Sequence, residues 1–179
     1  MTAAQLRERA LTHIARYNCT VEGLRRVLVR GITRNRMALS RNTFGQTSEP
    51  QKMLVSEADI EPLLKEFIGK GYLDDQKFAE RFIEVKTSSG MSVRTAQQKL
   101  SLKGVDRTLV DDVVEELDPD DLEAAKITAR KKKIGPFRLA DRDTHRQKDM
   151  AVLARRGFSY ETCRLVVDGD ADDQDSGTD

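Results

Sequence analysis

Residues 98–106 read Gln-Lys-Leu-Ser-Leu-Lys-Gly-Val-Asp and predict the end of one helix and the start of the next. A base such as Lys103 favours the negative end of a helix, and a following glycine adopts the left-handed conformation that ends it. The apolar Val105 then folds back onto the helix, and Asp106 is a suitable cap for a new one. This stretch therefore predicts two helices joined by a short turn.

The same order of base, glycine and apolar residue occurs four times along the chain. It is found at Arg30-Gly31-Ile32, Lys70-Gly71-Tyr72, Lys103-Gly104-Val105 and Arg156-Gly157-Phe158. We expect a helix to end at each of these places, because each supplies the residues of a helix stop.

Apolar residues between these stops recur with a helical period. Ile60, Leu63, Leu64, Phe67 and Ile68 form one such stripe. The stretch Asp118-Pro119-Asp120-Asp121 predicts a helix start, with Asp118 as the cap and Pro119 in the first position. No stretch shows the alternation and turn residues of a hairpin, so the predicted fold class is all-α. Further candidate caps are Thr20, Asp59, Asp75, Ser92, Asp106 and Ser159.

The helices group into three successive units of three helices, as in a helical repeat protein. We predict repeat 1 at residues 1–73, repeat 2 at residues 74–117 and repeat 3 at residues 118–169. A basic stretch at about residues 33–55, rich in Ser, Thr and Asn, is predicted to be a loop inserted in repeat 1. The acidic residues 170–179 are predicted to be a disordered tail.

Charge is segregated along the chain, although the net charge is only +1. Residues 23–52 hold seven basic residues and one acidic residue, whereas residues 106–123 hold nine acidic residues and Arg107. Blocks of one sign suit a charged partner better than scattered charges do.

No catalytic, metal or cofactor site is indicated. His13 and His145 lie far apart, Cys19 and Cys163 lack metal-ligand spacing, and the glycines end helices instead of forming a phosphate-binding loop. We therefore predict a protein that is not an enzyme and needs no metal or cofactor. The start of the chain lacks a secretory pattern, and no apolar run approaches the roughly 18 residues that cross a bilayer. A cytoplasmic location without a membrane partner is expected.

Several of these stretches resemble the successive signatures of the RecX family of regulatory proteins, and together they cover nearly the whole chain. They are residues 24–31 (Leu-Arg-Arg-Val-Leu-Val-Arg-Gly), residues 71–75 (Gly-Tyr-Leu-Asp-Asp) with Phe78-Ala79, residues 98–105, residues 154–160 (Ala-Arg-Arg-Gly-Phe-Ser-Tyr) and, as a variant of part of the family, Gly135-Pro136-Phe137-Arg138. The stretch at 33–55 departs from the family pattern.

The resemblance implies three tandem three-helix repeats that form an elongated, curved array. It implies a monomer that binds along the groove of the RecA–DNA filament and inhibits the recombinase, ATPase and co-protease activities of RecA, in DNA repair and the SOS response. Some members also bind DNA, so single- or double-stranded DNA is a further candidate partner.

Basic side chains are the candidates for partner binding, because clusters of Lys and Arg suit phosphates or acidic protein walls. The recurrence of these basic residues near helix ends also has a simpler explanation, since the helix dipole favours bases at the C-terminal end of a helix. The candidates are Arg25, Arg26, Arg30, Lys99, Lys103, Arg130, Lys131, Lys132, Lys133, Arg155 and Arg156.

Two alternatives to RecA binding remain open. One is a DNA-binding protein that acts without RecA and reads a groove with Gln97, Gln98 and Lys99, since amide and basic side chains reach base edges. The other is a helical-repeat scaffold for a different partner.

Overall fold

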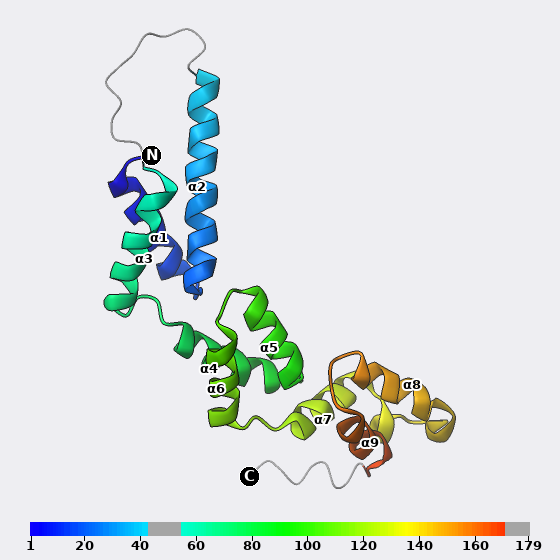
Figure 1. Cartoon of the computed structure of the whole chain (residues 1–179). Helices are drawn as coiled ribbons and strands as arrows, with labels where there is room; N and C mark the ends of the chain where they lie inside the picture. Colours follow the sequence, from blue (N-terminus) through cyan, green and yellow to red (C-terminus); the bar gives the residue numbers. More distant parts are fainter. Residues whose placement is uncertain (43–54, 171–179) are drawn as a thin grey trace. The chain divides into compact units, whose positions relative to one another are not determined.

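The computed structural model describes residues 1–42 and 55–170, and every regular element in these ranges is helical (Figure 1). The all-α helical repeat predicted from the sequence is therefore confirmed. The elements are α1 (Ala3–Arg16), α2 (Val21–Asn42), η1 (Glu57–Asp59), α3 (Ile60–Gly69), α4 (Asp75–Thr87), α5 (Val93–Leu102), α6 (Arg107–Leu117), α7 (Asp121–Lys132), η2 (Gly135–Phe137), α8 (Arg142–Ala154) and α9 (Tyr160–Asp168), where η marks a 3-10 turn.

Two compact units make up the chain. The first compact unit comprises Met1–Phe78 together with Lys103–Val105, and the second comprises Ala79–Leu102 together with the chain from Asp106 onward. The predicted repeat boundaries, after residues 73 and 117, do not coincide with this division and stay predictions.

The core of the first compact unit is built by α1, α2 and α3. Leu24 and Leu28 lie four residues apart on one face of α2, as the helical period requires, and both are fully buried. The other buried apolar side chains of this core are Leu6, Ala10, Ile32, Ile60, Leu63, Leu64, Phe67 and Leu73.

The helix end predicted at Arg30-Gly31-Ile32 is wrong, because α2 continues through Gly31 to Asn42. Gly31 is buried, and a Cβ atom there would lie 2.9 Å from Nε of Arg9, so this glycine lets the Arg9 side chain lie against α2. Thr33 comes two residues after Gly31, the position at which Asp106 follows Gly104 and caps a new helix. Thr33 does not cap a new helix, because its hydroxyl donates to the carbonyl of Val29 at 3.0 Å within α2.

Part of the predicted inserted loop is therefore helix. Residues 33–42 form the last turns of α2, and this correction follows from the uninterrupted helix. Residues 43–54 lie outside the described residues, as do residues 171–179 of the predicted acidic tail. The chain is described again from Val55, whose backbone N–H donates to the carbonyl of Met1 at 3.1 Å.

The other three predicted helix ends are confirmed. Gly71, Gly104 and Gly157 have φ angles of +71°, +83° and +92°, the left-handed region that favours glycine. After Gly71, the N–H of Tyr72 donates to the carbonyl of Phe67 at 2.9 Å, which satisfies one carbonyl at the end of α3.

Four of the predicted caps are confirmed. The side-chain oxygens of Thr20, Ser92, Asp106 and Ser159 each accept a hydrogen bond from a backbone N–H two or three residues further along. Each helix start is therefore fixed by a group that satisfies one of its free N–H donors.

Two other predicted caps, Asp118 and Asp75, are wrong, whereas Asp59 lies at the N-cap position of α3 without a side-chain cap bond there. Asp118 does not start α7 but ends α6 with a φ of +41°, because the following Pro119 disfavours the right-handed helical conformation there. Asp120 caps α7 instead, accepting from Leu122 and Glu123. Asp74 replaces Asp75 as the side chain that accepts from the first turn of α4, and Asp59 accepts from the N–H of Ser56.

In the second compact unit, α7, α8 and α9 enclose a separate core. Three small residues on α7 (Ala124, Ala125 and Ala129) are buried and let α9 pack closely against that helix. The remaining buried residues of this core are Ile134, Leu153, Phe158, Cys163, Val166 and Val167. Across the described ranges, no helix has the length and apolar character that a membrane crossing requires.

Candidate partner-binding surface

The start of α5 is held by groups from α7 and α8. The Ser92 hydroxyl, which is fully buried, donates to the carbonyl of Arg156 at 2.7 Å, and the Thr95 hydroxyl donates to the same carbonyl at 2.8 Å. The Asp121 carboxylate accepts from the N–H of Val93 at 2.8 Å. The first two bonds hold the turn that follows α8 beside the first turn of α5, and the third bond holds the start of α7 there.

The turn between α4 and α5 is held against α7. Gly90 has a φ of +91°, and its carbonyl accepts from the hydroxyl of Thr128 at 2.5 Å. A Cβ atom at Gly90 would lie 2.6 Å from that hydroxyl oxygen, so no larger residue fits without displacing the turn. The turn, the first half of α5 and the end of α8 are therefore fixed relative to one another.

Between these elements lies a groove of about 370 Å³, called the basic groove from here on. Its lining holds three cationic side chains and no acidic one. The lining residues are Ser89, Gly90, Met91, Thr95, Lys99, Arg155 and Arg156. Lys99, Arg155 and Arg156 are three of the basic residues that the sequence offers as candidates for partner binding, and the fold brings these three side chains to one groove.

The charges of the basic groove are poorly neutralised. Lys99, Arg155 and Arg156 are all exposed. Arg155 donates through Nε to the carbonyl of Ala151 at 3.1 Å, which orients its guanidinium without cancelling its charge. Within the described ranges, none of the three has an ion-pair partner, so the groove presents a net positive field to solvent.

The four bases at residues 130–133 do not act as one cluster. Arg130 lies 5.4 Å from the ring centre of Phe137, and Lys133 ends α7 with a φ of +52°. Lys131 does not line the basic groove but contacts a residue that does, since its Nζ donates to the carbonyl of Ser89 at 2.9 Å. Lys132 is exposed on the last turn of α7.

The candidates of the first compact unit are mostly engaged within the chain. Arg25 bridges Glu22 and Glu61, with its shortest nitrogen-to-oxygen distance to Glu61 at 3.0 Å, and Arg26 pairs with Glu22 at 2.9 Å. Lys103 places Nζ 5.7 Å from the ring centre of Phe78. Arg30 is exposed and forms no ion pair with any described residue.

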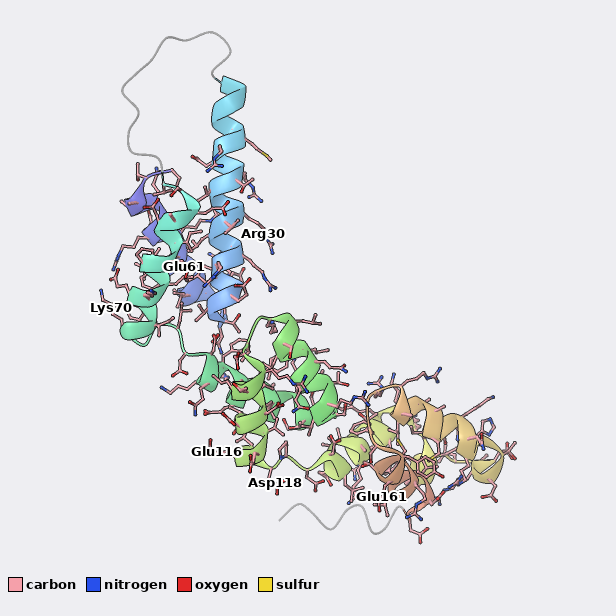
Figure 2. All side chains as sticks on the ribbon, in the orientation of Figure 1. Arg30, Glu61, Lys70, Glu116, Asp118 and Glu161 are labelled. Carbon is pink, nitrogen blue, oxygen red and sulfur yellow. The ribbon has the colours of Figure 1, made fainter. Side chains whose placement is uncertain are left out.

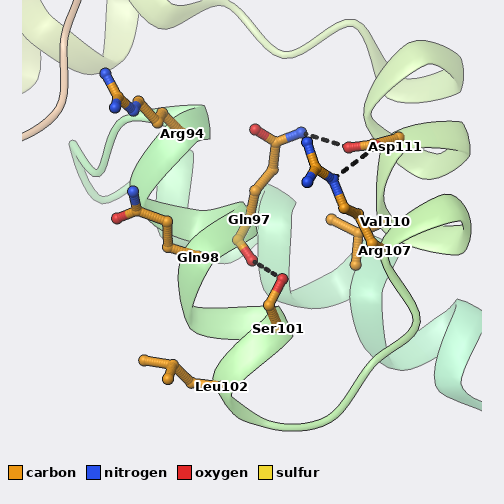
Figure 3. A pocket seen from close by; sticks show the side chains of 8 residues that line it. All are labelled: Arg94, Gln97, Gln98, Ser101, Leu102, Arg107, Val110 and Asp111. Carbon is orange, nitrogen blue, oxygen red and sulfur yellow. Dashed lines mark hydrogen bonds and ion pairs between the residues drawn. The ribbon is translucent and has the colours of Figure 1, made fainter.

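A second groove, of about 670 Å³, lies between α5 and α6 (Figure 3). Gln97 donates from its amide to Asp111 at 3.2 Å, and Arg107 pairs with the same carboxylate at 3.7 Å. The Gln97 amide is thus partly occupied by Asp111, while Gln98 and Lys99 are exposed. Because Asp111 accepts from the Gln97 amide, this side chain is less free to reach a base edge, which weakens the alternative that α5 reads DNA.

Comparison with known proteins supplies the family. Residues 74–114 match the family model described as RecX, second three-helix domain. The regulatory protein RecX of Myxococcus xanthus is 35% identical over 169 residues, which cover 91% of this chain and 84% of that protein. The chain belongs to the RecX family. The regulatory protein RecX of Vibrio vulnificus is 34% identical over 136 residues, which cover 74% of this chain and 88% of that protein.

Solved RecX structures share the fold. The crystal structure of RecX from Lactobacillus salivarius superposes with a TM-score of 0.66 at 16% identity, covering 97% of this chain and 96% of that one. A second crystal structure of regulatory protein RecX gives a TM-score of 0.64 at 20% identity, covering 93% of this chain and 72% of that one. The helical-repeat architecture of this RecX-family chain is therefore found in solved relatives.

Sequence reasoning missed the neutral half of the basic groove in this RecX-family chain. Ser89, Met91 and Thr95 line it without any charge that would have singled them out. Asp121 was expected only to favour a helix start, although it also holds α5. The recurrence of a hydroxyl residue followed by valine, at Thr20-Val21 and Ser92-Val93, was the available signal.

Proposed function

We propose that this RecX-family protein regulates a RecA recombinase by binding RecA filaments on DNA and lowering their ATPase, recombinase and co-protease activities. The observation that carries the proposal is the 35% identity to a regulatory protein RecX over 91% of the chain. The choice of RecA as the target rests on what membership in the family implies. We expect a monomer that acts in the cytoplasm, in DNA repair and the SOS response.

The basic groove is the proposed contact with the filament. Lys99, Arg155 and Arg156 surround a concave surface without an acidic neighbour in its lining, so they suit acidic side chains on the wall of a protein groove. Arginine forms forked bonds with carboxylates, which adds geometric selectivity to the charge. Because these charges are exposed, we expect them to act mainly on the rate of association and on its dependence on salt.

The first experiment measures ATP hydrolysis by RecA on single-stranded DNA while this protein is titrated in below one molecule per RecA protomer. A fall in rate at such ratios supports filament regulation, because simple competition for DNA requires more protein. An unrelated DNA-binding protein at the same concentrations is the control. No effect up to equimolar protein would contradict the proposal.

A pair of matched variants tests the groove itself. Arg156→Glu reverses a charge that lines the groove, whereas Arg164→Glu reverses an exposed charge on α9 that does not line it. We expect Arg156→Glu to weaken filament binding about tenfold at physiological salt, which corresponds to a loss of about 1.4 kcal/mol of binding free energy. Arg164→Glu should change the affinity less than twofold. Equal effects of the two variants would remove the groove from the interface.

A further inference from the structure

The last described residues of the chain are tied to α8. Arg146 donates two hydrogen bonds to the carboxylate of Asp168, at 2.6 and 2.7 Å. Arg142 donates to the carbonyl of Gly169, and one of its nitrogens lies 3.9 Å from a carboxylate oxygen of Asp170. These contacts hold the end of α9 beside the first half of α8, so the chain that follows Asp170 starts from this place.

The stretch that starts there is strongly acidic. Residues 170–179, called the acidic tail from here on, read Asp-Ala-Asp-Asp-Gln-Asp-Ser-Gly-Thr-Asp, with five aspartates and no basic residue. Their side chains are carboxylates at pH 7. The tail has no apolar side chain larger than that of alanine, so any attraction to the rest of the chain must come from charge.

The basic groove offers the opposite charge. Its three cationic side chains are exposed and form no ion pair with any described residue. Acidic residues of the folded part lie elsewhere, since Figure 2 shows Glu116 and Asp118 at the end of α6 and Glu161 at the start of α9, and none of them lines the groove. The charge of the groove is therefore left for an acidic group from outside the described ranges.

The acidic tail is long enough to reach the basic groove. Arg155 comes nine residues after Arg146, so it lies about 14 Å further along α8 and on roughly the opposite side of a helix that is about 10–12 Å across. A path along and across the helix is thus about 26 Å long. The eleven residues that follow Asp168, up to Asp179, span about 36 Å when extended.

We propose that the acidic tail folds back onto the basic groove of the same molecule and competes with acidic partners for it. Its regulatory meaning rests on the proposed function of the groove, whereas the contact itself rests on charge and reach. Because the tail belongs to the same chain, its effective concentration at the groove is on the order of millimolar. Attraction between exposed charges falls with salt, so the tail lowers the affinity of a partner without abolishing it.

The test compares the parent with a neutral-tail variant of the full chain. This variant carries Asp172→Asn, Asp173→Asn, Asp175→Asn and Asp179→Asn, which remove four charges and keep the length of the tail. The probe is a fluorescently labelled oligoglutamate peptide of about eight residues, a simple acidic ligand for exposed cations. Fluorescence anisotropy measures its affinity at about 0.05 M and about 0.5 M salt.

Both tails are then placed in two further backgrounds. Arg155→Gln with Arg156→Gln removes two charges of the basic groove. Arg94→Gln is the matched control, because Arg94 is an exposed arginine of α5 that lines the groove between α5 and α6 instead. Gln preserves helix propensity, and circular dichroism verifies that every variant keeps the helical content of the parent.

We expect the neutral tail to raise the affinity for oligoglutamate about threefold to tenfold at low salt and less than about twofold at high salt. With Arg155→Gln and Arg156→Gln, neutralising the tail should change the affinity less than about twofold, because tail and probe have lost their common site. With Arg94→Gln, the full gain should persist.

No gain from the neutral tail would overturn the proposal. Equal gains in the parent and in the groove variant would also overturn it, because they would show a general effect of net charge. A parent that sediments as a dimer and a neutral-tail variant that sediments as a monomer would place the tail in the groove of a second copy and overturn the intramolecular contact. None of these measurements contains RecA, so this proposal and the proposed function fail separately.

Discussion

The carboxylate of Asp121, the first residue of α7, accepts a hydrogen bond from the backbone N–H of Val93, the first residue of α5. The first compact unit repeats this relationship, since Asp75 at the start of α4 accepts from the N–H of Val21 at the start of α2, at 2.9 Å. In both places a hydroxyl residue comes just before the valine. Thr20 donates to the carbonyl of Lys103 at 2.7 Å, as Ser92 donates to that of Arg156. One joint is thus built twice from equivalent residues.

Removing the Asp121 carboxylate should loosen this joint. We expect Asp121→Ala to lower the free energy of unfolding by about 1–2 kcal/mol, because the N–H of the half-buried Val93 loses its acceptor. Asp121→Asn keeps an acceptor oxygen and should be about 1 kcal/mol less destabilising than the alanine variant. Urea denaturation at pH 7 measures both. An alanine variant as stable as the asparagine variant would contradict the role of this bond.

The same residue should contribute a pH dependence of opposite sign to that of a salt bridge. Burial raises the pKa of Asp121, Asp120 raises it further, and the bond from Val93 lowers it only in part. The folded state then binds more protons than the unfolded state, so this contribution to stability is largest at low pH and declines as pH rises above 3.8 through the folded pKa. Asp121→Asn should remove this decline, and denaturation curves between pH 3 and pH 7 would show it.

Glu66 should stabilise the first compact unit in the usual acid-sensitive way. Hydrogen bonds from Arg7, both 2.6 Å long, and then one from Lys70 lower the pKa of Glu66 to about 2. Its contribution is present above the ordinary value of 4.5 and is lost as pH falls towards 2. Glu66→Gln should lower the Tm at pH 7 and leave it unchanged near pH 2. Glu8→Gln, an exposed change on α1, is the control.

Alanine substitutions at two glycines of the first compact unit should distinguish the cost of backbone strain from the cost of steric crowding. Gly71 has a φ of +71° and nothing within 4 Å of an added Cβ, so Gly71→Ala should cost about 1 kcal/mol, the strain of the left-handed conformation. At Gly104, with a φ of +83°, the added Cβ would lie 2.5 Å from the Cβ of Glu22. Gly104→Ala should therefore cost about 2–4 kcal/mol in total. Thermal denaturation measures the stability of both variants. Equal stability of Gly71→Ala and Gly104→Ala would contradict this account.

Asp149 should be essential to the core of α7, α8 and α9. It is 1% exposed, and it accepts from the N–H of Gly135 at 2.9 Å and from Arg138 at 2.6 and 3.0 Å. Burial alone would raise the pKa of Asp149, but the bonds from Arg138 and Gly135 outweigh it and the pKa is lowered. Asp149→Ala should cost about 3–5 kcal/mol, because it leaves Arg138 and a backbone donor without their acceptor. Asp143→Ala, on the exposed side of α8, should stay within about 0.5 kcal/mol of the parent.

Local chemistry explains which parts of the fold could be predicted from the sequence. A glycine in the left-handed region ends a helix through contacts within a few residues, so Gly71, Gly104 and Gly157 could be recognised from their neighbours. Gly31 has the same neighbours but is buried under Arg9, a residue 22 positions earlier, and this tertiary contact cannot be read from a short stretch. The end of α2 was misplaced for that reason.

For the candidate surface too, the features that depend on neighbouring residues could be predicted, and those that depend on distant residues could not. The helical period places Lys99 on an exposed face, and the helix end places Arg155 and Arg156 together, so their exposure could be predicted. Arg25 has an equally suitable position, yet Glu61, 36 residues further along, engages its charge. Distant pairing of this kind depends on how α3 packs against α2, which no local pattern specifies.

One joint links the start of α2 to α4, and an equivalent joint links the start of α5 to α7. The start of α8 does not have the residues of this joint. There the residue before the helix is Asp141, which adopts a left-handed conformation with a φ of +54° and makes no side-chain cap bond. Asp141 has no hydroxyl that could donate to the carbonyl of another turn, so the bond that Thr20 makes to Lys103 and Ser92 makes to Arg156 has no equivalent at the start of α8.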